Sequence, residues 1–457
     1  MAMMKGFSNA FRVPELRKKI LITLGLVVVC RLVAQIPTPG VNWTGLANIF
    51  RSMSEGSQGG FLDWFEVFTG GALGQCAIGF LSIWPYISAQ IVIQLLGSVI
   101  PALEKLKKEG ESGRQQLAQI TRYLTIFLCV IQSWGIASAL CNPQMLGLSI
   151  NEPIVLNPGF GFKIMTVICM TTASLFIMWV ADQITTFGIG NGASLIIMIN
   201  ITSRLPTALR ALWDHYLGGG DLAKAQYASL AILILFFFMV VMGTVMLTQG
   251  VRKVPIHSAR RSVVGGASFG MQQTFMPLRV NYTGVMPIIF AQPLIQIPSA
   301  IISKITTPGS MMHRFAQDLA NPGAMHMIVY ALLIMFFTFF WVAKQFNAID
   351  ISENLKKGSS YIPGIRPGRA TAEYLDDMMT KITLIGGTGL LIVALVPMML
   401  MVSLEVPWVI ASFFGGTSLL IIVGVALDTL RVMESHLLVR KYEGFLAHGT
   451  LRGRGGV

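Results

Sequence analysis

Charged residues are scarce in this sequence. Only 12% of the 457 residues are Asp, Glu, Lys or Arg, whereas 53% are hydrophobic. A soluble globular domain carries about 25% charged residues, so this chain has too few charges to cover a water-facing surface of its size. Apolar runs of about 20 residues, the length that crosses a bilayer core, recur along the chain, and the mean hydropathy is +0.65. The composition therefore excludes a soluble protein and predicts a polytopic membrane protein.

Several chemical motifs are also missing. The five cysteines are scattered without a C-x-x-C pair, which favours apolar packing over a metal site or a disulfide framework. No G-x-x-x-x-G-K-[ST] loop occurs, so we expect no nucleotide hydrolysis by that route. No H-E-x-x-H motif occurs either, which argues against an intramembrane metallohydrolase. We expect no catalytic residue, no cofactor and no metal.

Ten apolar runs predict ten transmembrane helices, because continuous apolar runs are typical of helices and not of barrel strands. They are residues 19–36, 76–98, 118–139, 163–181, 189–204, 228–248, 284–303, 325–343, 382–403 and 411–429. Lysine and arginine concentrate on the cytoplasmic side of membrane proteins. With the N-terminus inside, twenty-six of the 34 basic residues lie in cytoplasmic segments and six lie outside. Both termini are therefore expected in the cytoplasm, with an uncleaved first span and a net charge of +13 that mainly reflects this bias.

Two short phrases occur twice. Residues 85–94 read PYISAQIVIQ and residues 287–296 read PIIFAQPLIQ; residues 192–197 read GASLII and residues 416–421 read GTSLLI. The phrases fall in spans two and five and again in spans seven and ten. Because five is odd, two similar halves of five spans enter the membrane from opposite sides, which is the inverted repeat of transport proteins. Proline and glycine at corresponding positions of the two halves predict that these four spans meet at a transport site.

The repeated phrases bring apolar bulk and amides to that site. The repeat pairs Ile87 with Ile289 and Ile197 with Ile421. Isoleucine is stiff at χ1, and a constriction of such side chains excludes ions by dewetting. The polar residues of the first phrase are amides, which can pair across a helix interface in lipid. These amides are Gln90, Gln94, Gln292 and Gln296.

An ion-coupled secondary transporter with inverted repeats is the alternative function. Such a carrier needs an Asp, Glu or His within the membrane to bind its coupling ion. Spans four, six and nine have none in their cores. Arg31 lies deep in span one, His326 at the edge of span eight and Asp428 at the end of span ten. Copurification with a small membrane subunit of one to three helices would favour the channel over the carrier.

A short apolar segment, FLDWFEVFTGGALGQ at 61–75, lies between spans one and two. Its aromatic residues have helical spacing, and a glycine pair breaks the helix before the span. These residues are Phe61, Trp64, Phe65, Phe68, Gly70 and Gly71. A helix this short cannot cross the bilayer, so it lies at the interface with aromatic anchors or enters a cavity lined by protein.

Several strings resemble the signature segments of the SecY family, the channel-forming subunits of the bacterial protein translocase. They are FTGGAL, WPYISAQIVIQLL, LKKEGESGRQQLAQITRYLT, GIGNGASLII, YIPGIRPGRAT and FFGGTSLLI, and the resemblance extends from about residue 10 to residue 445. It implies an all-α polytopic membrane protein of ten transmembrane helices, in two inverted five-helix halves around a central pore. The implied halves are residues 1–204 and 228–457, hinged at the loop 205–227.

The resemblance also assigns roles to residues of the pore. A ring that closes the pore would consist of Ile83, Ile87, Ala193, Ile197, Ile289 and Ile421, with Ala193 smaller than the residue usual in the family. Segment 61–75 corresponds to the plug below that ring. A lateral gate would open between spans two and three on one side and seven and eight on the other, which places the four glutamines at the gate.

The cytoplasmic loops 249–280 and 344–381 are long and basic. In the family such loops receive the ribosome and the SecA motor ATPase, and the docking residues implied here are Arg252, Lys253, Arg260, Arg261 and Arg366. The tip of the first loop, VVGGASFGMQQ, has fewer basic residues than the family leads us to expect. SecE and SecG are the implied membrane subunits. The expected function is a passive channel in the bacterial inner membrane, which passes signal-sequence-bearing and nascent chains outward and releases hydrophobic segments into the lipid bilayer.

Overall fold

The fold comes from a computed structural model. The structure describes residues 13–42, 69–72, 74–97, 100–142, 155, 157–216, 224–258, 274–307, 309–321, 323–404, 410, 413 and 416–448. By its internal contacts the chain divides into two compact units, one of residues 1–56, 65–205 and 425–457 and the other of residues 57–64 and 206–424.

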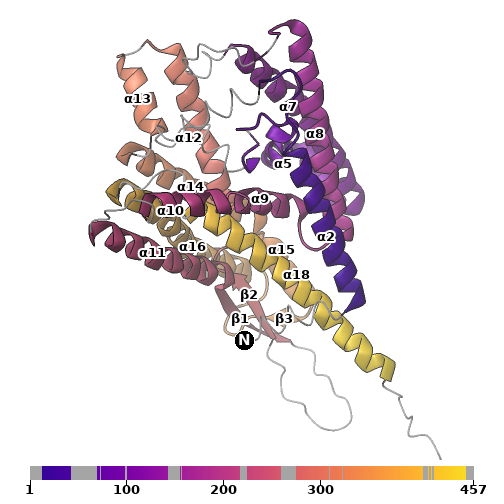
Figure 1. The fold of residues 1–457 in the computed structure, drawn as a ribbon. Coiled ribbons are helices and arrows are strands. Elements are labelled where there is room, and N and C mark those ends of the chain that lie inside the picture. The colour runs from indigo at the N-terminus through magenta and orange to yellow at the C-terminus, as the bar shows by residue number, and fades with distance from the viewer. Residues whose placement is uncertain are drawn as a thin grey trace, which may run out of the picture. The chain divides into compact units, whose positions relative to one another are not determined.

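The first unit is helical in its described part. Its elements are α2 (Pro14–Val33), the 3-10 helix η1 (Ile78–Leu81), α5 (Trp84–Leu96), α6 (Pro101–Lys108), α7 (Glu111–Cys141), α8 (Phe160–Phe187), α9 (Gly192–Thr202) and the second part of α18 (Gly416–His448). The long helices α7 and α8 lie side by side (Figure 1).

Small residues line the buried face of α7. Its buried face repeats every four residues, and most of its members have short side chains. They are Gly113, Thr121, Thr125, Cys129, Ser133, Ala137 and Leu140. The hydroxyls of Thr121, Thr125 and Ser133 donate to the carbonyl oxygens four residues earlier, so these polar groups are satisfied inside the membrane span.

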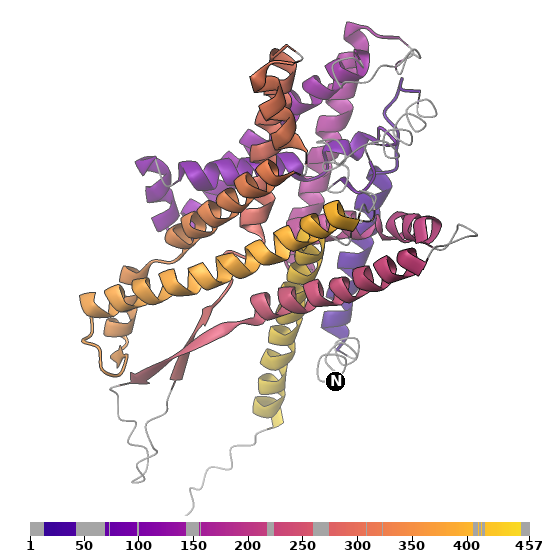
Figure 2. The same ribbon diagram turned by 90° about the vertical axis from the view of Figure 1, so that its left-hand side faces the viewer.

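The second unit contains helices and a small sheet. Its elements are α10 (Leu205–Tyr216), α11 (Lys224–Gln249), β1 (Val251–Ser258), β2 (Thr274–Arg279), α12 (Met286–Ile305), α13 (Met311–Ala320), α14 (Ala324–Gln345), α15 (Ala348–Lys357), β3 (Ser360–Tyr361), α16 (Arg369–Leu404) and the start of α18. The strand order is β2-β1-β3, with both pairings antiparallel. Figure 2 shows the β1–β2 hairpin continuing from the end of α11.

The described residues of this unit form three hydrophobic clusters, a small one of Tyr216, Leu233 and Ile410 and two larger ones. In one of the larger clusters, α12, α14 and α16 pack around Ile295, Tyr330 and Ala394. In the other, which we call the hairpin cap, the sheet packs on α15 and on the adjacent ends of α14 and α16. Its buried residues are Val254, Leu278, Val342, Phe346, Ala348, Ile362, Ala372, Leu375, Met378, Met379 and Ile382. The two basic loops expected from the sequence are thus largely folded in their described parts.

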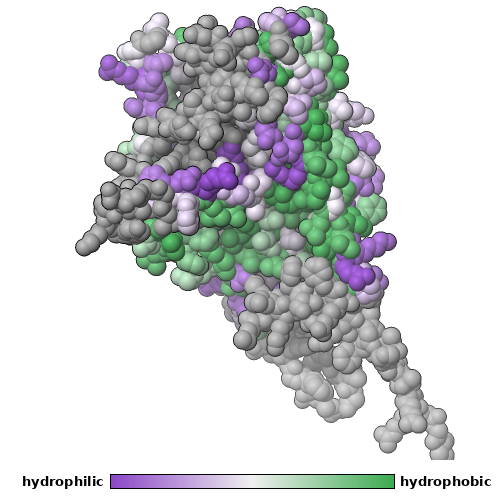
Figure 3. Space-filling model, viewed as in Figure 1, coloured by the Kyte–Doolittle hydropathy of each residue, from purple (hydrophilic) through white to green (hydrophobic). Residues whose placement is uncertain are grey.

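The membrane spans follow the sequence prediction. Eight described helices are long and apolar enough to cross a membrane, and the first and last of the ten predicted spans fall on α2 and α18. Along the first unit, large apolar side chains such as Phe127, Ile131 and Trp179 are exposed. Figure 3 shows hydrophobic residues gathered on the surface over α2 and α8. Such a surface suits lipid and not water.

Candidate functional site

The first repeated phrase begins a helix in each unit at the same position. Helix α5 follows Ile83 and helix α12 follows Val285, the two residues that the repeat aligns. Ile83 has φ −90° and ψ 1°, and Val285 has φ −91° and ψ −3°. Each caps its helix with the backbone alone, and a proline occupies the first turn, where its missing N–H leaves no intrahelical bond unmade. The repeated proline therefore starts two equivalent helices.

The second phrase also starts its two helices at the same residue. Helix α9 begins at Gly192 and α18 at Gly416, the first letters of GASLII and GTSLLI. The side chain of Asn191 accepts a hydrogen bond from the Ser194 amide at 3.2 Å, which caps α9. The residues that the sequence repeat aligns therefore begin the corresponding helices in both pairs.

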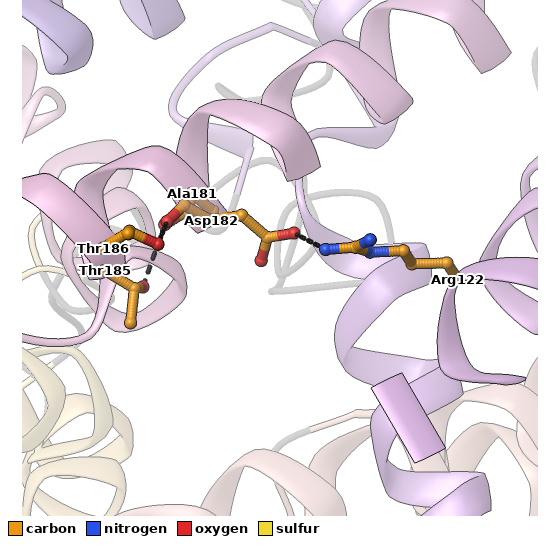
Figure 4. Close-up of polar contacts among 5 residues, drawn as sticks. All are labelled: Arg122, Ala181, Asp182, Thr185 and Thr186. Atoms are coloured by element: carbon orange, nitrogen blue, oxygen red, sulfur yellow. Dashed lines mark hydrogen bonds and ion pairs between the residues drawn. The ribbon is translucent and has the colours of Figure 1, made fainter. Parts of the chain in front are cut away.

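Close contact with α8 explains the glycine at residue 192. Its amide donates to the hydroxyl of Thr185 at 2.9 Å, and that hydroxyl donates to the Ala181 carbonyl at 2.9 Å. A Cβ at residue 192 would clash with the same Ala181 oxygen. Figure 4 shows this turn of α8, where Asp182 also pairs with Arg122 of α7 at 2.8 Å. The beginning of α9 is therefore fixed against α8.

The predicted ring residues lie at or near these helix starts. Ile83 and Ile87 belong to the first unit and are buried, while Ile289 and Ile421 belong to the second and are buried as well. On α9, Ala193 and Ile197 are partly buried. The ring joins residues of both units, and it stays a prediction.

The four predicted gate amides differ in exposure. On α5, Gln90 and Gln94 are exposed. On α12, Gln292 and Gln296 are buried, and the Gln296 side chain donates to the Ala320 carbonyl at 3.4 Å. The structure therefore gives Gln296 a role in joining α12 to the end of α13.

Only the end of the predicted plug is described. Phe61, Trp64, Phe65 and Phe68 lie outside the described residues. Gly70 and Gly71 have φ +68° and +88°, a backbone conformation that favours glycine. The residues before Thr69 lie outside the described part of the segment, so the helix break stays a prediction.

Three of the five predicted docking residues are described, and they lie on β1 and on the turn before α16. Arg252 and Lys253 on β1 are exposed, and Arg260 and Arg261 lie outside the described residues. Arg366 is exposed between Gly364 (φ +82°) and Gly368 (φ +106°). Its carbonyl accepts from the Thr371 hydroxyl at 2.9 Å, which ties this turn to α16. The turn presents the Arg366 side chain to solvent.

The family model for SecY matches residues 77–430. The chain belongs to the SecY family. The curated relatives include the protein translocase subunit SecY of Thermotoga maritima, 38% identical over 99% of this chain and 100% of the relative. The SecY of Streptomyces coelicolor is 41% identical over 97% of this chain and 100% of the relative.

Solved structures share the SecY fold with this chain. A protein conducting channel has a TM-score of 0.61 at 16% identity, with 95% of each chain covered. The Sec61 channel of a canine ribosome-channel complex has a TM-score of 0.57, again at 16% identity and 95% coverage of each chain. At this identity the likeness establishes the fold, which is the mainly helical membrane fold predicted from the sequence.

Sequence reasoning missed a polar cluster within this SecY-family chain. Arg31 of α2 binds the Asn200 side chain and the Gly70 carbonyl, and the Asn200 amide donates to Ser82 at 3.0 Å. The signal was present, because Arg31 is a charged residue deep in span one. Its partner could not be found from the sequence, since Asn200 is 169 residues away. No group of three or more potential metal ligands occurs among the described residues.

Proposed function

We propose that this chain is the channel-forming subunit of a Sec protein translocase. The matched starts of α5 and α12, with Ile83 and Val285 in the same backbone conformation, are the observation that carries the proposal. Two helices that begin alike in two inverted halves bring equivalent residues to the same depth of the membrane. Membership of the SecY family supports the same function.

In this mechanism the chain is a passive conduit. Ile83, Ile87, Ala193, Ile197, Ile289 and Ile421 form the constriction that closes the pore. Their side chains hold water out because they are apolar and narrow the path, and dewetting then blocks ions. A passing polypeptide displaces them and is enclosed by the same apolar side chains. The chain is not itself an enzyme, and the work comes from a motor ATPase such as SecA or from a translating ribosome.

The lateral gate lies between α5 and α7 on one side and α12 and α14 on the other. Exposed amides at Gln90 and Gln94 support a surface on α5 that separates from a partner helix without leaving a buried polar group unpaired. Gln292 and Gln296 complete the gate from α12. Hydrophobic segments leave through it into lipid, while segment 61–75 plugs the resting pore and residues 205–227 act as the hinge.

The partners dock at the hairpin cap on the cytoplasmic side. Arg252, Lys253 and Arg366 are exposed there, and their positive charge suits ribosomal RNA or an acidic face of the motor. Arg260 and Arg261 belong to the same predicted docking set and lie outside the described residues. SecE and SecG are the small membrane partners. The location is the bacterial inner membrane with both termini in the cytoplasm.

Conductance through asparagine variants of the ring tests the proposal. Asn at residue 87, 289 or 421 places an amide in the constriction and favours wetting. A shift of about 1.4 kcal/mol toward the open state raises a small open fraction tenfold. We expect Ile87→Asn, Ile289→Asn and Ile421→Asn to leak ions in planar bilayers and to pass chains with defective signal sequences. Ile234 of α11 is 47% exposed, so Ile234→Asn is the control and should do neither. If the ring variants conduct no more ions than the parent, the assignment of these residues to a pore ring is wrong.

A further inference from the structure

Arg31 has no role in the channel mechanism described above, although it is a cation within span one. In the first unit its Nη1 donates to Oδ1 of Asn200 at 3.3 Å, and its Nη2 donates to the carbonyl oxygen of Gly70 at 3.3 Å. No ion pair to Arg31 is found in the described part of the chain. Its charge is thus directed at neutral oxygens, and one of them is the backbone of segment 61–75. A charged residue held in a membrane span in this way marks a functional position.

The Gly70 carbonyl is enclosed by several groups. The Ser203 hydroxyl lies 3.4 Å from it and donates to the Asn200 carbonyl at 2.7 Å. A Cβ at Gly70 would lie 2.5 Å from Arg31 Nη1 and 2.9 Å from Ser203 Oγ, and the φ of +68° also favours glycine. Glycine is therefore required here by both space and backbone conformation.

Asn200 is itself held rigidly. It is 5% exposed, and its Nδ2 donates to Ser82 Oγ at 3.0 Å. The carbonyl of Ser82 accepts from the Ser174 hydroxyl of α8 at 2.7 Å. A side chain whose own partners are fixed can position Arg31, because little conformational freedom remains to be lost when the bond forms.

The chain after Gly70 forms one piece with the end of α2. Ala34, Ala72 and Ala77 form a small buried cluster. The Cys76 carbonyl accepts from the Thr38 amide at 2.9 Å and from the Thr38 hydroxyl at 2.6 Å. Residues 69–77 are therefore attached to the first unit at both ends, by Arg31 at Gly70 and by Thr38 at Cys76.

We propose that Arg31 is a positioning residue that anchors the described end of segment 61–75, residues 69–72, through the Gly70 carbonyl, with Asn200 and Ser203 completing the anchor. The inference rests on the proposed function in one respect, because its effect on the channel depends on that segment acting as the plug. Release of the anchor frees the backbone at Gly70, so residues around it open more often.

The buried thiol of Cys76 reports the anchor directly. Cys76 is 4% exposed, so a protein that keeps this cysteine and replaces the other four reacts with a maleimide only when residues 69–77 open. In the full translocase complex in proteoliposomes, we expect Arg31→Gln to raise the labelling rate about tenfold, because two hydrogen bonds from a charged donor are lost. Arg31→Lys should fall between Gln and the parent, since lysine lacks the planar fork that reaches both oxygens.

Arg122→Gln is the matched control. It removes an arginine of the same unit, whose partner is Asp182, and it should leave the labelling rate of Cys76 unchanged. Parent-like labelling in Arg31→Gln overturns the anchor. If that variant does not insert, Arg31→Lys decides the question, and a parent-like labelling rate in Arg31→Lys overturns the anchor.

Conductance of the same variants separates the two proposals. Faster labelling together with ion leakage supports both the anchor and the plug. Faster labelling with parent-like conductance supports the anchor and indicates that segment 61–75 does not act as the plug. Unchanged labelling overturns the anchor whatever the conductance, and it leaves the channel function standing.

Discussion

Replacement of Gly192 by alanine should destabilise the protein, because α9 begins in contact with α8. The added Cβ would clash with the carbonyl oxygen of Ala181. Both sides of this contact are backbone, so no side chain can rotate away. The start of α9 must move, and that movement also stretches the 2.9 Å bond from the Gly192 amide to Thr185.

The two effects give the expected size of the change. Overpacking of this kind typically costs about 1–3 kcal/mol, and a buried amide without its partner costs about 1–3 kcal/mol more. We therefore expect a loss of about 2–6 kcal/mol for Gly192→Ala. Thr185→Val should show the second effect alone, since it removes the hydroxyl and adds no atom at Gly192.

Gly135→Ala is the matched control. Gly135 lies on the exposed face of α7, and a Cβ there would meet nothing within 4 Å. Alanine favours a helix over glycine by up to about 1 kcal/mol, so this variant should be neutral or slightly more stable. Purified proteins would be heated in detergent and the folded fraction measured by size-exclusion chromatography. Equal midpoints for Gly192→Ala and Gly135→Ala would refute the contact between α9 and α8.

Three further changes test other parts of the molecule. Arg366→Glu should leave the protein inserted and folded but stall motor-driven secretion into membrane vesicles, because Arg366 is exposed on a defined turn; loss of the protein from the membrane would instead indicate a structural role. Leu375→Ala should destabilise the hairpin cap by about 2–5 kcal/mol, since Leu375 is 0% exposed in that core; faster proteolysis after Arg252 is the readout, and parent-like proteolysis would contradict it. Reporters fused after residue 110 or 360 should lie in the cytoplasm and one after residue 220 outside; a cytoplasmic signal at 220 would contradict the arrangement of five spans in each half.

The spans could be predicted because their cause is local. A run of apolar residues long enough to cross a bilayer forms a helix, since no other structure satisfies the backbone there. The positions at which α5 and α12 begin could also be expected, because Pro85 and Pro287 are favoured in a first turn. Apolar composition and proline positions thus predict most of the helical fold.

The hairpin cap could not be predicted in the same way. Strand β1 reads VRKVPIHS, a short stretch with a proline and several polar residues, which has little strand signal of its own. It pairs with β2 and with β3, about a hundred residues further along the chain, and Val254 is buried in the same core as residues of α16. These contacts are long-range, so packing and not local propensity determines the structure.

In the candidate site, too, local features could be predicted from the sequence and long-range contacts could not. Gly70 and Gly71 were predicted as a helix break from residue type alone, and both have positive φ angles. The anchor of Arg31 to Asn200 joins side chains from α2 and α9, and the sequence contains no pattern that links them. The ring remains a prediction, because its members come from both units.

Crosslinking of a stalled secretory chain tests the central claim most directly. Single cysteines would replace Ile87 on α5, Ile289 on α12 and Ile234 on α11, and the stalled chain would carry one cysteine at the length that spans the membrane. If the chain is the protein-conducting channel, disulfides form with the cysteines at residues 87 and 289 and not with the one at the exposed residue 234. Crosslinks to residue 234 alone, or to none of the three in an actively secreting membrane, would contradict passage of polypeptides between the two halves.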